Sequence, residues 1–422
     1  MSEIKLHTLK QKLWTIFVTS LITRMLGLII LPKTPSFLGP DEGTYASLAS
    51  WTEKGLSANE FPIYGKGLYL SARTFIWPSI VFQKLGFNPL YSVRITAFMY
   101  GVLTLGLTFG AILKTLKANK LNRNIDTRNQ SLIVGIFGVF AFLPSHFIWS
   151  LLGLRESAVE FWVLLTFATV FWIFHVRKKI VFSSLLAMLI SIVFVFSARP
   201  QVGWVLSISL VLYLLFTLRC KLSLITLPLV LIAAFLGFLI NSGTTINSGT
   251  TISKIVETLK ESAEISSYKH EVNKIDAASA IQTQSCPLQS KNAISQPPAE
   301  FATYICLIWR APYMTSTFLF RPIIGIDVTS TSSLFAAIEN LIWLCGFGLI
   351  IIQYFRRRKI QFWRQILPSI IFFTTYVVSA GSYEGNMGTA FRHKSLILWV
   401  VLLLLLSSFW NNSQETLNKK GN

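Results

Sequence analysis

Long apolar runs alternate with short polar gaps along almost the whole chain. A helix needs about 20 mostly apolar residues to cross a bilayer, and runs near that length recur from the first part of the chain to its last part. The runs cover residues 14–31, 91–113, 131–150, 157–175, 180–197, 201–218, 222–240, 335–355, 365–380 and 395–410. The pattern predicts an all-α multi-pass membrane protein with about ten transmembrane helices.

Basic residues gather in every second gap between these runs. The basic gaps contain Lys5, Lys10 and Lys12; Lys114, Lys117, Lys120, Arg123 and Arg128; Arg177, Lys178 and Lys179; Arg219 and Lys221; the "RRRK" at 356–359 with Arg364; and Lys419 and Lys420. Cytoplasmic loops carry an excess of Lys and Arg. This side is therefore expected to be the cytoplasm, with both chain ends on it.

The opposite side then holds a first outer loop at 32–90 and a large late loop at 241–334. Residues 74–87 contain Pro78 and Lys84, which favours a helix in the membrane interface over a span. Residues 301–326 carry two arginines and two prolines, so no clean span is expected there. Three regions follow: an N-terminal transmembrane bundle at 1–240 that includes the first outer loop, the outer loop region at 241–334, and C-terminal transmembrane helices at 335–422.

Composition supports this class. Of the 422 residues, 52% are hydrophobic and 13% charged, and the mean hydropathy is +0.56, whereas soluble domains carry about 25% charged residues. A net charge of +20 would suggest nucleic acid in a soluble chain. Here the charge follows the gaps, so no nucleic-acid partner is expected. The first apolar run lacks a small-residue cleavage site and is expected to be a retained helix. Whether Cys286 and Cys306 are bonded is left open.

Several charged residues fall at the outer ends of the predicted helices. They are Asp41 and Glu42 in "GPDEGTY"; Arg155 and Glu156 in "LRES"; Arg199 in "SARPQ"; and Glu384, Arg392, His393 and Lys394 in "SYEGNMGTAFRHK". Charges at a membrane are costly and often functional. A carboxylate can take a proton from an attacking hydroxyl, and cations can neutralise a phosphate leaving group. The combination suggests sugar transfer from a lipid-linked phosphate.

Each of these residues also has an ordinary structural interpretation. Asp41 could cap a helix, and Glu42 could only complement a helix dipole. Arg155 and Glu156 could pair with each other, and Arg199 could extend toward the interface. His393 could belong to a solvated basic patch. Their predicted location on one side of the membrane is the stronger signal.

The motif "GPDEGTY" after the first span resembles the acidic motif in the first outer loop of GT-C glycosyltransferases, and "LRES" and "GNMGTAFRHK" resemble segments of membrane proteins of bacterial surface-polysaccharide assembly. The resemblance implies a polyprenyl-phosphate-sugar donor, a glycan, lipid or protein acceptor, an inverting reaction on the extracytoplasmic face, and the bacterial inner membrane. It places the essential acidic residue at Asp41, with Glu42 adjacent. The residues expected to bind donor and acceptor are then Arg155, Glu156, Arg199, Glu384, Arg392, His393 and Lys394.

The family's second acidic motif has no clear equivalent in this sequence. Only Glu300, Asp327 and Glu384 could take its place. No cofactor is therefore assigned, and the question of a divalent metal is left open. Two other functions also remain open. An O-antigen-type polymerase would also use arginines and a large outer loop. A polysaccharide or lipid transporter, or a scaffold, would perform no bond chemistry, and a transporter would place charges along a path through the bilayer.

Overall fold

The computed structural model describes most of the chain before residue 243 and shorter parts after it. The described residues are 2–34, 41–57, 60–61, 68–118, 127–177, 181–217, 221–242, 312–313, 315–328, 331–356, 360–383, 391–394 and 396. The chain divides into two compact units. Unit 1 comprises Met1–Gly243, Trp343–Phe372 and Leu396–Asn422, and unit 2 comprises Thr244–Ile342 and Phe373–Ser395.

Every element assigned in the described residues is helical, which confirms the all-α class. The helices are α1 (Ser2–Ile30), α2 (Asp41–Glu53), α4 (Arg73–Lys84), α5 (Pro89–Ala118), α6 (Thr127–Phe142), α7 (Pro144–Trp149), α8 (Glu156–Phe171), the π-helix η3 (Trp172–Arg177), α9 (Phe182–Ala198), α10 (Pro200–Phe216), α11 (Lys221–Ser242), α14 (Thr331–Arg356) and α15 (Ile360–Tyr383).

Three helices of the described chain are long and apolar enough to cross a membrane: Thr8–Ile30, Pro89–Lys114 and Glu156–Phe174. Shorter apolar helices lie at Gln130–Phe142, Phe182–Ala198, Pro200–Phe216, Leu222–Phe238, Ser333–Leu349 and Leu367–Gly381. The chain is thus compatible with a membrane protein. The expected run at 395–410 lies outside the described residues except for Leu396, as do Cys286 and Cys306.

The expected span at 131–150 is interrupted. The backbone of Leu143 is extended (φ −58°, ψ 127°) and not helical, and α7 starts at Pro144. Proline disfavours a helical conformation in the residue before it and suits the first position of a new helix. Hydropathy alone therefore joined two helices, α6 and α7, into one. Most of residues 74–87 lie in a helix, α4 (Arg73–Lys84), with Pro78 inside it. Its place in a membrane interface stays a prediction.

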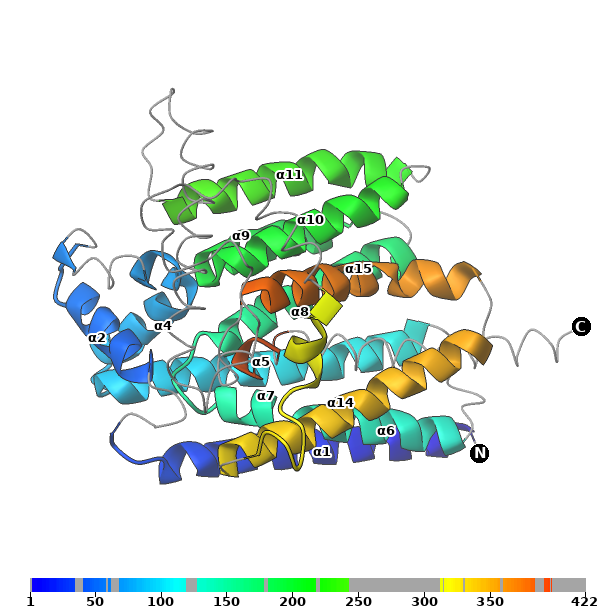
Figure 1. Cartoon of the computed structure of the whole chain (residues 1–422), viewed down its shortest axis with the longest axis horizontal. Coiled ribbons are helices and arrows are strands. Elements are labelled where there is room, and N and C mark those ends of the chain that lie inside the picture. Colours follow the sequence, from blue (N-terminus) through cyan, green and yellow to red (C-terminus); the bar gives the residue numbers. More distant parts are fainter. Residues whose placement is uncertain are drawn as a thin grey trace, which may run out of the picture. The chain divides into compact units, whose positions relative to one another are not determined.

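Within unit 1, consecutive helices run back and forth, so that many of their ends meet at one end of the bundle. Figure 1 shows α2 and α4 there, together with the starts of α5, α8 and α10 and the end of α9. α5 packs against α1, α2, α4 and α8, and α9 packs against α4, α8, α10 and α11. The three predicted site segments of unit 1, around Asp41, Arg155 and Arg199, belong to this end.

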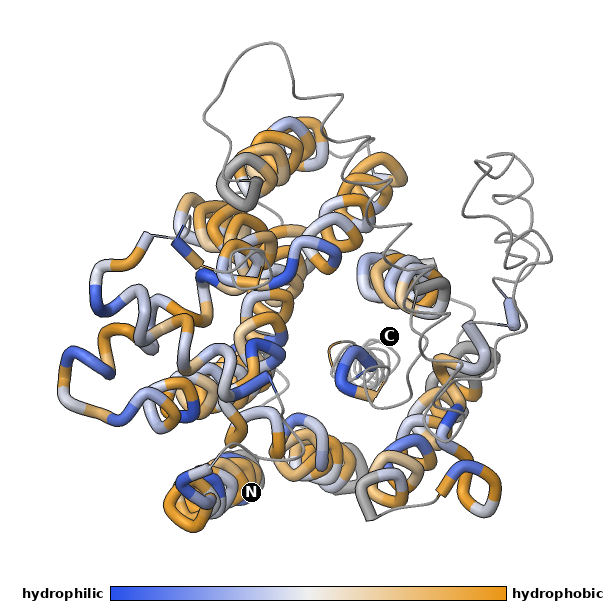
Figure 2. The backbone as a smooth tube through the Cα atoms, turned by 60° about the vertical axis from the view of Figure 1, so that its left-hand side comes forward, coloured by the Kyte–Doolittle hydropathy of each residue, from blue (hydrophilic) through white to orange (hydrophobic). Residues whose placement is uncertain are grey.

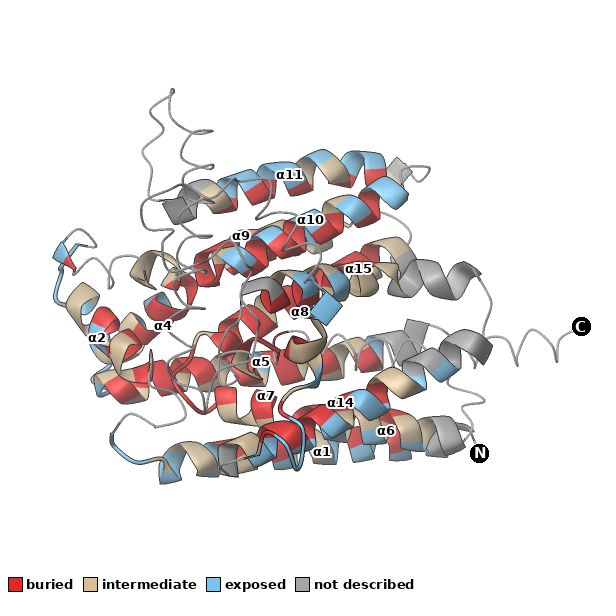
Figure 3. Ribbon diagram, viewed as in Figure 1, coloured by how far each residue is buried: buried red, intermediate tan, exposed pale blue. Residues whose placement is uncertain are grey.

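Several unit 1 helices expose apolar faces. Figure 2 shows hydrophobic residues along most of the helix lengths, and Figure 3 shows exposed residues along the outer sides of α1 and α11. The exposed large side chains there include Ile22, Leu26, Ile29 and Ile30 of α1 and Leu224, Leu231, Ile232 and Phe235 of α11. Soluble monomers rarely expose apolar surface in such long continuous rows, and lipid is the solvent that suits it.

Candidate functional site

The acidic pair opens helix α2, and its two carboxylates have different surroundings. Asp41 and Glu42 both lie in the first helical turn, where unpaired backbone N–H groups favour negative charge. Asp41 is partly exposed, whereas Glu42 is fully buried. The pair in the sequence thus divides into one accessible and one inaccessible carboxylate.

Glu42 is held by Arg94 of α5. The guanidinium donates from Nε to Glu42 Oε1 at 2.5 Å and from Nη2 to Oε2 at 3.1 Å. It also donates from Nη1 to the Pro32 carbonyl at 2.5 Å and from Nη2 to the Thr34 carbonyl at 2.9 Å. Charge-assisted forked bonds of this kind fix geometry as well as adding energy. Arg94 therefore ties the segment after α1 and the start of α2 to α5.

The hairpin before α8 meets the same carboxylate. The Gly153 backbone N–H donates to Glu42 Oε1 at 3.1 Å. A Cβ atom at position 153 would lie 2.5 Å from Val93 Cγ2 and 3.1 Å from Glu42 Cγ, so only glycine fits this close approach. Glu42 thus joins α2, α5 and the hairpin, and this arrangement places Asp41 and Arg155 at one end of the bundle.

Arg155 lies directly before α8 and reaches toward the start of α4. Its Nη1 donates to the Ser71 carbonyl at 3.1 Å and to the Ser71 hydroxyl at 3.0 Å. Its Nε is buried and has no hydrogen-bond partner within the described part of the chain. A buried donor without a partner is costly. The atom is suited to an anionic oxygen supplied by a ligand.

Arg199 is positioned by the proline that follows it. Pro200 begins α10, and Arg199 is extended (φ −162°, ψ 97°) between α9 and α10, as expected for a residue before proline. Its Nη1 lies 3.3 Å from Glu156 Oε1, and both side chains are less than a tenth exposed. Arg199 is therefore turned inward to Glu156 instead of extending to the interface.

Four of the predicted site residues act electrostatically on one buried tyrosine. Burial raises the pKa of Tyr45, and the charges of Arg155, Glu156, Asp41 and Arg199 all act on its hydroxyl. These charges come from α2, from the start of α8 and from the turn between α9 and α10. The structure thus gathers side chains that are more than 150 residues apart in the sequence around one hydroxyl.

Tyr45 was not among the candidate site residues predicted from the sequence. It lies four positions after Asp41 in "DEGTY", and residues at that spacing share a helix face. Its ring packs edge-on against Phe75, with centroids 5.5 Å apart. The signal was present in the quoted motif, but a tyrosine near an apolar segment is more often only a packing residue. Arg94 was visible only as a charge inside an apolar run.

The C-terminal predicted residues belong to unit 2. Glu384 lies outside the described residues, and Arg392 is partly buried. His393 and Lys394 are 4% and 1% exposed. These two residues are therefore buried and do not form a solvated basic patch.

Lys394 is surrounded by acceptors. Its Nζ donates to the carbonyls of Leu319 at 2.9 Å and Arg321 at 2.8 Å and to Asn340 Oδ1 at 2.9 Å. Burial lowers the pKa of Lys394 to about 7, and the charge of Glu339 acts in the opposite direction. The three donor positions of an ammonium are thus matched by three protein acceptors, which is typical of a structural contact.

Asp327, considered above as a second acidic residue, is also engaged. It accepts from Arg321 Nε at 3.0 and 3.1 Å and from the Ile323 backbone N–H at 2.8 Å. The hydrogen bond from Arg321 lowers the pKa of Asp327. Among the residues that the structure describes, no three His, Cys, Asp or Glu side chains are grouped as a metal ion would need. Glu300 lies outside them.

The chain matches no known family model, and no curated protein matches it either.

Proposed function

We propose that the chain is a membrane glycosyltransferase of the GT-C type, which transfers a sugar from a polyprenyl-phosphate donor to an acceptor hydroxyl. The observation that carries the proposal is that Asp41, Arg155, Glu156 and Arg199 all act electrostatically on the buried Tyr45 hydroxyl. A carboxylate and two guanidiniums at the ends of apolar helices are the groups that a phosphate leaving group and an attacking hydroxyl require. The proposed setting is a bacterial inner membrane, with this end of unit 1 on the extracytoplasmic side.

Asp41 is the proposed base. Its neighbour Glu42 is fully buried and bonded to Arg94 and Gly153, so Glu42 holds the start of α2 in place. Asp41 remains partly exposed at the same helix end. In the reaction it would accept the proton of the acceptor hydroxyl as the oxygen attacks the sugar's anomeric carbon, with inversion.

Arg155 and Arg199 are the proposed phosphate ligands. Arg155 has a buried Nε without a protein partner. The 3.3 Å separation between Arg199 and Glu156 is longer than the 2.7–2.9 Å typical of a charge-assisted bond. Arg199 would then add a second guanidinium beside Arg155 at the same end of unit 1. Lys394, with three protein acceptors, is assigned no direct contact with the donor.

The test uses the purified protein in lipid with a panel of polyprenyl-phosphate sugars and measures release of polyprenyl phosphate. We expect release by the wild type and its loss in Asp41→Asn. Glu53→Gln is the matched control, because it makes the same carboxylate-to-amide change at the exposed far end of α2. Release that persists in Asp41→Asn would reject the proposed base, and a folded wild type inactive with every donor would reject the proposal.

A transporter is the second candidate function. The buried Arg24 and Glu160 lie within two of the helices long enough to cross a membrane, and charges within spans are expected along a transport path. A protein that moves a labelled lipid-linked sugar across vesicles without releasing polyprenyl phosphate would favour this function over transfer.

A further inference from the structure

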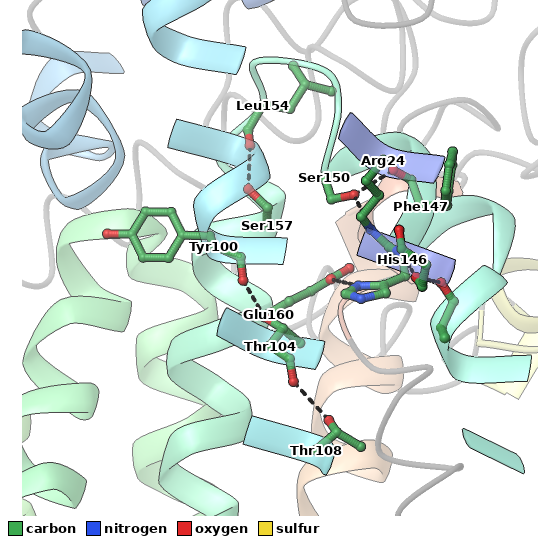
Figure 4. A network of polar contacts seen from close by, with 12 residues as sticks. Arg24, Tyr100, Thr104, Thr108, His146, Phe147, Ser150, Leu154, Ser157 and Glu160 are labelled. Carbon is green, nitrogen blue, oxygen red and sulfur yellow. Dashed lines mark hydrogen bonds and ion pairs between the residues drawn. The ribbon is translucent and has the colours of Figure 1, made fainter. Parts of the chain in front are cut away.

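A second group of buried polar side chains in unit 1 contains none of the site residues predicted from the sequence. Glu160 follows Glu156 by four residues on α8, and His146 belongs to α7. His146 Nδ1 lies 2.8 Å from Glu160 Oε2, and both side chains are at most 4% exposed. Figure 4 shows the carboxylate and the imidazole facing each other. The imidazole stacks on Phe140 with ring centroids 4.7 Å apart, which fixes its plane.

Arg24 of α1 completes the group. Its Nε donates to the Ser150 hydroxyl at 2.9 Å, and its Nη1 bonds the hydroxyl of Ser20. The guanidinium lies 4.8 Å from the centre of the Phe147 ring. Arg24 is fully buried and interacts electrostatically with both Glu160 and His146. Three helices thus place a carboxylate, an imidazole and a guanidinium together (Figure 4).

Charge balance sets the protonation state of the imidazole. The Arg24 and Glu160 charges cancel, so a protonated His146 would leave a net positive charge inside an apolar bundle, which is strongly unfavourable. A neutral imidazole that faces a carboxylate through Nδ1 carries its proton on that nitrogen. Nε2 of His146 is then a hydrogen-bond acceptor.

Within the described residues, His146 Nε2 and Arg24 Nη2 are buried and have no hydrogen-bond partner. One is an acceptor and the other a donor, and leaving either unpaired in the interior costs free energy. The nearby hydroxyls are already engaged. Thr104 and Thr108 donate to carbonyls one turn earlier on α5, and Ser157 donates to the Leu154 carbonyl (Figure 4). The unmet pair calls for an oxygen that can both donate and accept.

We propose that Glu160, His146 and Arg24 form a base site that binds a hydroxyl oxygen, either of water or of a substrate. The hydroxyl donates to His146 Nε2 and accepts from Arg24 Nη2. When the O–H bond breaks, its proton goes to Nε2, the resulting imidazolium is stabilised by Glu160, and the negative oxygen by Arg24. A base oriented by a carboxylate is a general way to activate a hydroxyl. The site contains none of the residues proposed for sugar transfer, and its binding of a hydroxyl does not depend on Asp41.

The test is ¹⁵N NMR of histidine-labelled full-length protein in lipid. We expect His146 to be neutral and protonated at Nδ1, with Nε2 receiving a hydrogen bond. In Glu160→Gln the imidazole should shift toward the form protonated at Nε2. Thr108→Val should leave the His146 signals unchanged, because Thr108 donates only to its own helix. His146 protonated at both nitrogens, or at Nε2 alone, in the wild type would overturn the proposal.

The same spectra identify the oxygen. Magnetisation transfer from water to Nε2 in lipid alone would assign the site to water. A contact that appears only after a soluble methyl glycoside is added would assign it to a substrate hydroxyl. No contact in either sample would show a structural ion pair only and reject the base site. His146→Asn assigns the signals. If this variant does not fold, replacing the other four of the chain's five histidines achieves the same.

Discussion

Arg94 Nε lies 2.5 Å from Glu42 Oε1 in an ion pair with no solvent exposure on either side chain. The pair fixes the start of α2 to α5, and it leaves the partly exposed Asp41 as the neighbouring carboxylate at the end of the bundle. Its energetic role differs from that of a surface pair, because removing one partner leaves a buried charge without compensation.

Arg94→Met should therefore destabilise the protein by about 3–5 kcal/mol, the usual effect of breaking a buried pair. Thermal unfolding in lipid or detergent measures this. Lys84→Met is the matched control, since it removes a positive charge from an exposed position on α4 and should change stability by less than about 0.5 kcal/mol. Equal melting of Arg94→Met and the control would show that the pair is not structural.

Gly153→Ala should also destabilise the hairpin. The added methyl group would approach Val93 and Glu42 too closely, and overpacking of this kind costs about 1–3 kcal/mol. Gly135→Ala on α6 is the control, because nothing lies within 4 Å of its added Cβ. Removing a helical glycine there should stabilise by up to about 1 kcal/mol. Melting temperatures that move the same way in both variants would contradict this account.

Hydropathy predicted most of the long helices, because they coincide with the apolar runs of the sequence. The error at 131–150 arose because Pro144 lies within an apolar run and breaks the backbone without changing the hydropathy. Pro200, by contrast, lies beside Arg199, and the polar residue marked the turn between α9 and α10.

Pairing was beyond what the sequence could establish. Glu42 and Arg94 are 52 residues apart, and helix periodicity says nothing about which charge meets which. The sequence offered Arg155 and Glu156 as a pair, whereas the structure directs Arg155 to Ser71 and Glu156 to Arg199. The gathering of Asp41, Arg155 and Arg199 was predicted only as a shared side of the membrane.

Tyr45→Phe should keep the fold and reduce sugar transfer about tenfold, the loss of one hydrogen bond worth about 1.4 kcal/mol. The ring contact with Phe75 survives the change, while the hydroxyl among the four charges is lost. Because burial raises the pKa of Tyr45, the wild-type hydroxyl stays protonated above neutral pH, and the loss should be the same at pH 6 and pH 9. Tyr69→Phe is the control; full activity in Tyr45→Phe would exclude a role in substrate binding.

Lys394 should make stability depend on pH in unit 2. Burial lowers its pKa from 10.5 to about 7 in the folded protein, so between these values the unfolded chain binds more protons than the folded one. Stability then rises with pH across this window, because unfolding takes up a proton there. The penalty for burying the ammonium applies in full below about pH 7 and is relieved as the pH approaches 10.5.

Lys394→Met should remove this contribution, so that the melting temperature of the variant rises less between pH 7 and pH 10 than that of the wild type. At fixed pH the variant also loses three hydrogen bonds, so the slope against pH, and not the absolute melting temperature, is the diagnostic quantity. Lys10→Met, an exposed lysine on α1, should keep the wild-type slope. Parallel curves for Lys394→Met and wild type would show that Lys394 remains an ammonium across the window, held by its three acceptors.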